Sequence, residues 1–198
     1  RLPKDSTPRY SSWHNTMSKE QLILQQYKEC TVAMPTWFLT RTLFDRVGPF
    51  IEAPAEDLMF FQKHCAMGGR VDRVDEVLLI YRYHAESVTF GVHPKEIRKA
   101  KVNHLEANLL SGLERFSIWG GKEARDCYRA MNEESRGKMT CFLDIDPKKI
   151  EQPYTCKEFP RKMPVRHWSE GKLPENRPII ICVKPNLTSG VFEANLES

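Results

Sequence analysis

Two adjacent carboxylates, Glu56 and Asp57, are the residues of this sequence best suited to acid–base chemistry. They follow Pro54, which starts a predicted helix, so both fall in or near its first turn. A carboxylate held at a fixed point in a cleft can take the proton from an attacking hydroxyl group. The alternative is that two acids in a first turn only complement the helix dipole. We predict that Asp57 is the catalytic base and that Glu56 belongs to the same catalytic pair.

Three other side chains, Trp37, Arg82 and His84, are candidates for substrate binding. The indole ring of Trp37 could stack on a sugar ring, with burial in the core as an equal alternative. Arg82 and His84 follow a predicted buried strand, at the point where a loop would meet a ligand. Arginine suits the geometry of a diphosphate, and histidine can bind a divalent metal. Ordinary surface roles remain the alternative for both residues.

A glycine-rich turn, Gly120-Gly121-Lys122, suggests a second kind of site. Such turns between a strand and a helix bring backbone N–H groups close to phosphate, as in dinucleotide-binding proteins. The third glycine of that pattern is missing, and Glu123 would repel phosphate. We therefore interpret the turn as a tight connection in a Rossmann-like module.

Composition and charge narrow the classes of function. Of the 198 residues 40% are apolar and 28% charged, which is typical of a folded protein. The net charge of +4 comes from scattered Lys and Arg, so we expect no nucleic-acid partner. No apolar run approaches the ~20 residues of a membrane span, and we expect a cytoplasmic protein. The six cysteines include no C-x-x-C pair, which favours buried free thiols over disulfides or a zinc site.

Four motifs follow one another in an order typical of a known family. They are Met34-Pro35-Thr36-Trp37-Phe38, Phe44-Asp45-Arg46-Val47-Gly48-Pro49-Phe50, Glu56-Asp57-Leu58 and Leu79-Ile80-Tyr81-Arg82-Tyr83-His84. The order resembles the second half of the GT-A-type family-2 glycosyltransferases, in which a "vG-x-F" turn, an "ED" at a helix start and a "yR-x-H" strand end recur. Further motifs, such as Ser117-Ile118-Trp119 and Gly190-Val191-Phe192-Glu193, are similar to N-acetylglucosaminyltransferase-like members of that family.

This resemblance implies an inverting transfer of N-acetylglucosamine from the nucleotide-sugar donor UDP-GlcNAc to the hydroxyl group of a glycan or small-molecule acceptor. It implies that Asp57 is the base. It also implies a divalent metal, Mn²⁺ or Mg²⁺, held on the donor diphosphate by an Asp-x-Asp motif that precedes the Glu-Asp pair. Here Asp144-Ile145-Asp146 follows the pair, so we interpret it as the end of a strand. We predict a carboxyl-terminal fragment that lacks the nucleotide- and metal-binding half and is inactive alone.

Two other classes of function remain open. One is a non-catalytic binding or scaffolding module that has kept the fold without the reaction. The other is a nucleotide-binding regulatory domain centred on Gly120-Gly121. For residues 114–198 alone, however, the charge of Glu123 leads us to expect no measurable binding of NAD or a UDP-sugar.

The elements that position these residues form an α/β fold in two parts. Residues 1–113 are expected to be the acceptor-side, carboxyl-terminal half of a GT-A domain, with helices over 18–27, 40–47, 54–67 and 95–113. Strands are predicted over 31–34 and 70–83, too few for a complete sheet, so an apolar face should stay exposed. Residues 114–198 are expected to be a small Rossmann-like domain. Its parallel strands are predicted over 116–119, 138–143 and 178–183, and its helices follow Gly121 and residue 190.

Overall fold

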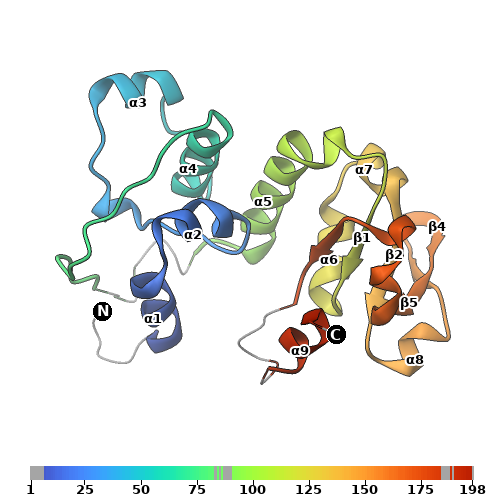
Figure 1. Cartoon of the computed structure of the whole chain (residues 1–198). Helices are drawn as coiled ribbons and strands as arrows, with labels where there is room; N and C mark the ends of the chain where they lie inside the picture. The colour runs from blue at the N-terminus through green and yellow to red at the C-terminus, as the bar shows by residue number, and fades with distance from the viewer. Residues whose placement is uncertain are drawn as a thin grey trace. The chain divides into compact units, whose positions relative to one another are not determined.

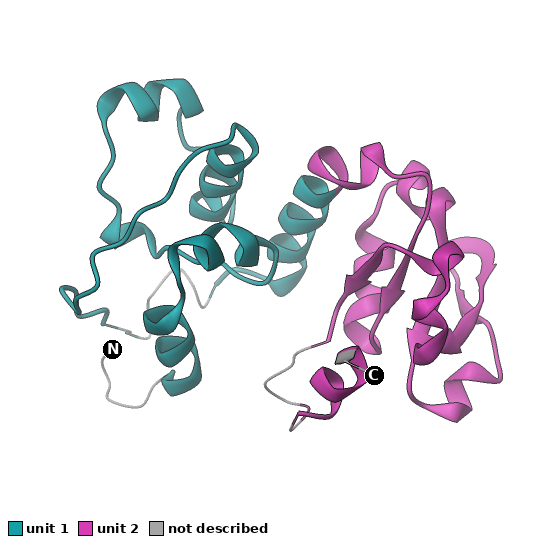
Figure 2. Cartoon of the chain, in the orientation of Figure 1, with its two compact units in different colours: residues 1–105 teal, residues 106–198 magenta. Residues whose placement is uncertain are grey.

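The computed structural model describes residues 7–82, 84, 86, 91–183, 188 and 190–197. The chain is an α/β protein that divides into two compact units, residues 1–105 (unit 1) and 106–198 (unit 2), as Figure 2 shows. Among the described residues, no helix combines the length and the apolar character that crossing a membrane requires.

The boundary between the units lies earlier than the one expected after residue 113. Residues that follow Leu105 contribute to the second unit, because their side chains and carbonyl groups bond within it. The Glu106 carboxylate accepts a hydrogen bond from the backbone N–H of Asn132 at 2.7 Å. Leu110 is fully buried, and its carbonyl oxygen accepts a hydrogen bond from Lys138 Nζ at 3.1 Å.

Unit 1 consists of helices joined by irregular segments (Figure 1). Its elements are α1 (Pro8–Thr16), α2 (Lys19–Leu24), η1 (Gln25–Tyr27), η2 (Met34–Thr36), α3 (Arg41–Val47), α4 (Glu56–Ala66) and most of α5 (Pro94–Asn108). The described part of this unit contains no strand, so both strand predictions were wrong. Residues 34–36 form a 3₁₀ turn instead, and between residues 70 and 82 only Arg82 makes an isolated bridge.

Local signals in the sequence explain where these helices begin and end. The Ser18 hydroxyl accepts a bond from the N–H of Gln21, whose side chain accepts the N–H of Ser18 in return, which is the predicted capping box. Thr40 caps α3 in a similar way, by accepting the N–H of Leu43 at 3.1 Å. Gly48 ends α3 with a φ of 95°, a conformation that glycine adopts without steric cost.

An aromatic cluster packs around the buried Phe60 and Phe61 of α4 in unit 1. It contains Trp37, Phe44, Phe50, Phe60 and Phe61, whose ring centroids lie 4.8–6.5 Å apart in the contacting pairs. These are the distances at which aromatic pairs add stability beyond the area that they bury. The cluster therefore fixes the segment around Trp37 against α4.

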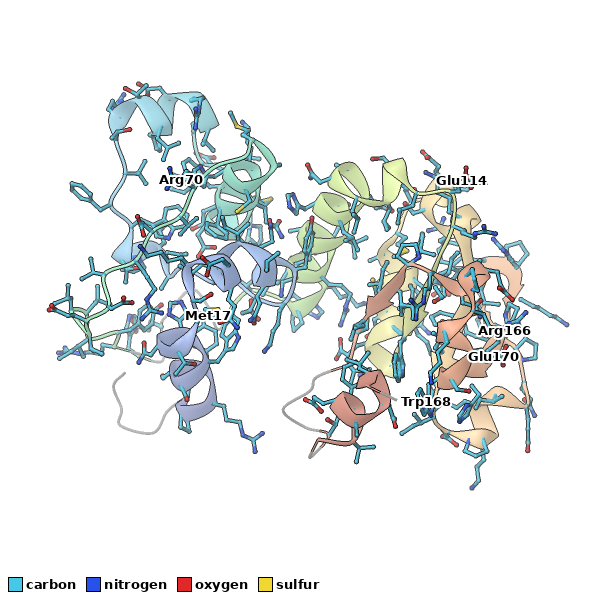
Figure 3. The ribbon with its side chains drawn as sticks, in the orientation of Figure 1. Met17, Arg70, Glu114, Arg166, Trp168 and Glu170 are labelled. Atoms are coloured by element: carbon cyan, nitrogen blue, oxygen red, sulfur yellow. The ribbon has the colours of Figure 1, made fainter. Side chains whose placement is uncertain are left out.

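The segment expected to be a strand, residues 70–83, forms no strand where it is described and is largely exposed. Arg70, labelled in Figure 3, opens it, and its carbonyl oxygen is hydrogen-bonded to Nε2 of His64 at 3.0 Å. Arg73 then donates hydrogen bonds to the carbonyl oxygens of Met17 and Asn15, and these bonds tie the segment to the end of α1. Further along the same segment, the apolar side chains of residues 77–80 are 39–80% exposed.

Unit 2 is built around a parallel four-stranded sheet with the order β5-β2-β1-β6. Its elements are η4 (Leu110–Gly112), β1 (Phe116–Trp119), α6 (Lys122–Ala130), α7 (Glu133–Lys138), β2 (Met139–Asp144), α8 (Pro147–Ile150), β3 (Tyr154–Cys156), β4 (Phe159–Met163), β5 (Val165–His167), η5 (Trp168–Lys172), η6 (Pro174–Asn176), β6 (Ile179–Ile181) and α9 (Val191–Glu197). The three predicted strands are β1, β2 and β6. Between β2 and β6 the structure adds β5 and the antiparallel β3–β4 hairpin, none of which was predicted.

Each face of this sheet is covered by different elements, because alternate residues of a strand point to opposite faces. On one face Phe142 of β2 packs edge-to-face against Tyr128 of α6, with ring centroids 5.6 Å apart. On the other face Trp119 of β1 contacts Phe192 of α9 at 4.9 Å and stacks on Trp168 at 5.7 Å. Figure 1 accordingly shows α9 beside the end of β1.

Candidate functional site

Asp57 lies in the first turn of α4 and is half-buried. Its Oδ1 accepts a hydrogen bond from the backbone N–H of Leu58 at 2.7 Å. Burial raises the pKa of the Asp57 carboxyl, the negative charges of Glu56 and Glu29 add to this rise, and the Leu58 N–H partly offsets it. A carboxylate with a raised pKa is a stronger base than an ordinary exposed aspartate.

The turn before α4 has an uncommon backbone conformation that places both acids at the helix start. Ala55, the residue that precedes the helix, has a φ of 64° and a ψ of 36°, in the left-handed region. Non-glycine residues rarely adopt this conformation, and it is found more often at functional sites. Glu56, the other predicted catalytic acid, is also half-buried, next to Asp57.

Trp37 is packed within unit 1 rather than open to solvent on both faces. Its indole N–H donates a hydrogen bond to the carbonyl oxygen of Val32 at 2.9 Å. The ring stacks on Phe50 and tilts against Phe60, with centroids 6.2 Å and 5.5 Å away. The next side chain, Phe38, is fully exposed. The contacts of Trp37 are those of a core residue, which was one of the two roles that the sequence left open.

Arg82 and His84 lie at the end of the extended segment, and both are exposed. Tyr83, between them, is outside the described residues. The buried strand that was expected to position these two side chains is not formed, because the apolar residues before Arg82 find no ladder partner in the described part of unit 1. Their assignment to substrate binding stays a prediction.

Sequence reasoning missed three residues of unit 1, Glu29, Cys30 and Lys101, of which Glu29 and Cys30 are coupled electrostatically to Asp57. Lys101 Nζ donates a hydrogen bond to the carbonyl oxygen of Lys28 at 2.7 Å and lies 3.4 Å from Glu29 Oε1. Cys30 is half-buried, and its desolvation together with the charge of Asp57 raises the pKa of its thiol to about 12. No local motif marks these residues, because the partners Glu29 and Lys101 lie 72 positions apart in the chain.

The glycine turn of unit 2 lies where the strand order changes direction. β1 has β2 on one side and β6 on the other, and open α/β sheets bind ligands at such a point, outside the carboxyl ends of the strands. Gly120 has a φ of 146°, and a Cβ atom there would lie 3.2 Å from the backbone of Cys182. Gly120 is therefore needed for the close approach of β1 and the residue after β6.

The groups beside this turn are already paired within the protein. Asp144, at the end of β2, accepts hydrogen bonds from the N–H groups of Ile145 and Asp146 at 2.8 and 3.0 Å. Its other oxygen pairs with Lys149 Nζ at 3.1 Å, and the same ammonium lies 3.7 Å from the position of a Cβ on Gly121. As interpreted from the sequence, Asp144 is the end of a strand.

The donor groups in the described part of the chain do not fit a divalent-metal site. Within residues 7–82, 84, 86, 91–183, 188 and 190–197, no three His, Cys, Asp or Glu side chains are grouped so that they could hold a metal ion. All six cysteines are free thiols. The metal that the resemblance implies is therefore not assigned to any of the described residues.

Comparison with known proteins adds no assignment. No protein-family model matches the chain, and no solved structure matches it. The fold class, an α/β chain of two units, thus stands on the structure alone, and its function has to be argued from the residues.

Proposed function

We propose that this chain is the acceptor-side part of an inverting GT-A glycosyltransferase, which transfers N-acetylglucosamine from UDP-GlcNAc to an acceptor hydroxyl group. The observation that supports this proposal most is the half-buried Asp57 at the start of α4, whose pKa is raised by burial. The ordered motifs around it, including the Gly48 turn before α4 and the Arg82 segment after it, are the second support.

In the proposed reaction Asp57 acts on the acceptor. Its carboxylate accepts the proton of the acceptor hydroxyl while the hydroxyl oxygen forms a bond to the anomeric carbon of the donor. The bond from that carbon to the diphosphate breaks, and UDP leaves with the electron pair. Attack from the face opposite to the leaving group inverts the configuration at the anomeric carbon. A base whose pKa lies above the usual aspartate range holds the proton better, and this favours the transfer.

The other residues have supporting roles in this proposal. The aromatic cluster, with Trp37 at its edge, holds α4 rigid, and preorganised geometry is what a general base requires. Arg82 and His84 remain candidates for contacting the donor. A Mn²⁺ or Mg²⁺ ion would neutralise charge on the leaving diphosphate when bound, and its ligands would come from outside the described residues.

The test is transfer by the full-length protein with UDP-GlcNAc as donor and a panel of glycan acceptors. Asp57→Asn, which is nearly isosteric, should lower turnover by ~10²–10⁴-fold, because it removes the base, and should leave binding of UDP almost unchanged. Asp45→Asn is the matched control, because Asp45 is an exposed acid of α3 whose carboxylate pairs with Arg41 at the surface. Equal turnover of folded Asp57→Asn and wild type would remove Asp57 from the mechanism.

A second candidate, nucleotide binding by unit 2, is favoured by one observation, the position of Gly120-Gly121 at the point where the strand order changes. Against it, Lys149 and Asp144 already pair beside this turn, and Glu123 lies in the first turn of α6. We therefore expect no binding of NAD(H) or UDP-GlcNAc to unit 2. Calorimetric titration of the whole chain and of its Gly121→Val variant is the test. A Kd below ~100 µM, about 5.5 kcal/mol, that Gly121→Val abolishes would make nucleotide binding the leading function.

A further inference from the structure

Four consecutive apolar side chains of unit 1, those of residues 77–80, are exposed to solvent. Val77, Leu78 and Ile80 are 72–80% exposed, and Leu79 is 39% exposed. Single exposed apolar residues are normal on a protein surface, but a contiguous group of them marks a surface that binds something. The run is therefore a candidate interaction surface.

The backbone of the same segment is open to pairing. Among the described residues, no N–H or C=O group of residues 74–80 makes a hydrogen bond to another described residue. The start of the segment is nevertheless held in place, because Asp72 pairs with Lys19. Arg73 donates a hydrogen bond to the carbonyl oxygen of Met17. A segment that is fixed at one end and presents a row of free backbone donors and acceptors is a template for a further strand.

The charges that flank the run, those of Glu76 and Arg82, determine which partner fits. When two identical strands pair antiparallel, the two-fold axis is perpendicular to the sheet, so directly opposite residues are both even-numbered or both odd-numbered. With Leu79 on the axis, Glu76 of one copy lies opposite Arg82 of the other. Leu78 then lies opposite Ile80 on the same face. This register matches charge with opposite charge and apolar with apolar, so the segment is complementary to itself.

The neighbouring registers lose this match. With the axis at Leu78, Glu76 would lie opposite Ile80, and with the axis at Ile80, Leu78 would lie opposite Arg82. A parallel pair in register would place Glu76 opposite Glu76, and like charges in that position are destabilising. Charge complementarity therefore favours a second copy in the antiparallel register centred on Leu79.

We propose that residues 76–82 are a self-recognition segment, through which two copies of this chain pair as antiparallel strands centred on Leu79. The pairing supplies backbone hydrogen bonds to the segment and covers its apolar side chains. By symmetry it forms the Glu76–Arg82 ion pair twice, and these two pairs fix the register. The inference stands apart from the proposed function, because it concerns assembly and not sugar transfer.

The first test is the mass of the whole chain in solution, measured by sedimentation equilibrium. A short interface binds weakly, so the chain concentration should range from ~1 to ~300 µM. The mass of the wild type should rise with concentration from 23.1 kDa to twice this value. A mass that stays at 23.1 kDa over the whole range would overturn the inference.

Charge reversal then tests the register. Glu76→Arg and Arg82→Glu each place like charges opposite each other twice in the dimer, so each variant should dimerise about tenfold more weakly or worse. An equimolar mixture of the two variants restores both attractive pairs and should dimerise about as strongly as the wild type. The double variant, with both changes in one chain, should do the same. Glu52→Arg reverses an exposed acid outside the segment and is the matched control, which should dimerise like the wild type.

The swap also separates pairing from misfolding. Glu76 and Arg82 are exposed, so every variant should keep the circular dichroism spectrum of the wild type. A dimer that persists unweakened in both single variants is formed by another surface and would overturn the inference. A mixture of the folded single variants that stays monomeric, while the wild type dimerises, would refute the register centred on Leu79.

Discussion

Replacing Gly120 by alanine should destabilise unit 2 by about 2–4 kcal/mol, because two separate penalties add. A residue with a side chain at a φ of 146° is strained, which costs on the order of 1–3 kcal/mol. The new Cβ would also lie 3.2 Å from the carbonyl carbon and oxygen of Cys182, and this backbone cannot rotate away as a side chain can. The hydrogen bond from the N–H of Cys182 to the carbonyl of Trp119, 2.8 Å long, would lengthen as the two segments separate.

Urea unfolding followed by tryptophan fluorescence measures the destabilisation of unit 2 in Gly120→Ala. Unit 2 contains Trp119 and Trp168, stacked at 5.7 Å, so loss of its fold should change their emission. The control is Gly137→Ala, at a helical position where an added Cβ meets nothing within 4 Å, and alanine there should stabilise by up to ~1 kcal/mol. Equal stabilities of Gly120→Ala and the wild type would refute the argument that this glycine is required by the chain's own packing.

Two further predictions concern unit 1. Trp37→Ala should lower the free energy of unfolding by about 3–5 kcal/mol, because it leaves a cavity in the aromatic cluster. Phe38→Ala, at a fully exposed position, should change the free energy of unfolding by less than about 0.5 kcal/mol. Thermal unfolding of both variants measures the difference. Because the folded-state pKa of Asp57 is raised, the folded protein binds more protons there than the unfolded chain does. Stability is therefore lost as the pH rises from the ordinary aspartate value of 3.8 through the folded pKa. Asp57→Asn should accordingly be more stable than the wild type at pH 7, but not at pH 3, when both are unfolded with urea at each pH. A variant that is less stable than the wild type at pH 7 would contradict a raised pKa of Asp57.

The elements of unit 2 could be predicted well where the sequence pattern is local. The run Met139–Leu143 is apolar enough to indicate a strand, and the buried positions of α6, Ala124 and Tyr128, recur at helical spacing. β5 could not be found in this way, because Val165–His167 has a single apolar residue and pairs with β2 only through contacts distant in sequence. Beside this strand Arg166 and Glu170, labelled in Figure 3, form an ion pair at 2.8 Å.

Unit 1 was less predictable, for a reason that the run of residues 77–80 illustrates. Val77, Leu78, Leu79 and Ile80 have the composition of a buried strand, but a strand forms only where another strand supplies hydrogen bonds. The sequence indicates the β-propensity of residues 77–80, but it does not indicate whether another strand is present to pair with them. Asp57 could be proposed from its position in a helical first turn, whereas the Glu29–Lys101 ion pair could not, because its two partners lie 72 positions apart in the chain.

The exposure of residues 77–80 has a practical consequence for handling the chain in solution. A short stretch of aliphatic residues with strong β-propensity and no charge is the type of sequence that nucleates intermolecular aggregation. Asp75 and Glu76 immediately precede it, and flanking charges of this kind act as gatekeepers that oppose stacking of identical segments. Neutralising these two acids should lower the solubility of the chain, and adding a charge within the run should raise its solubility.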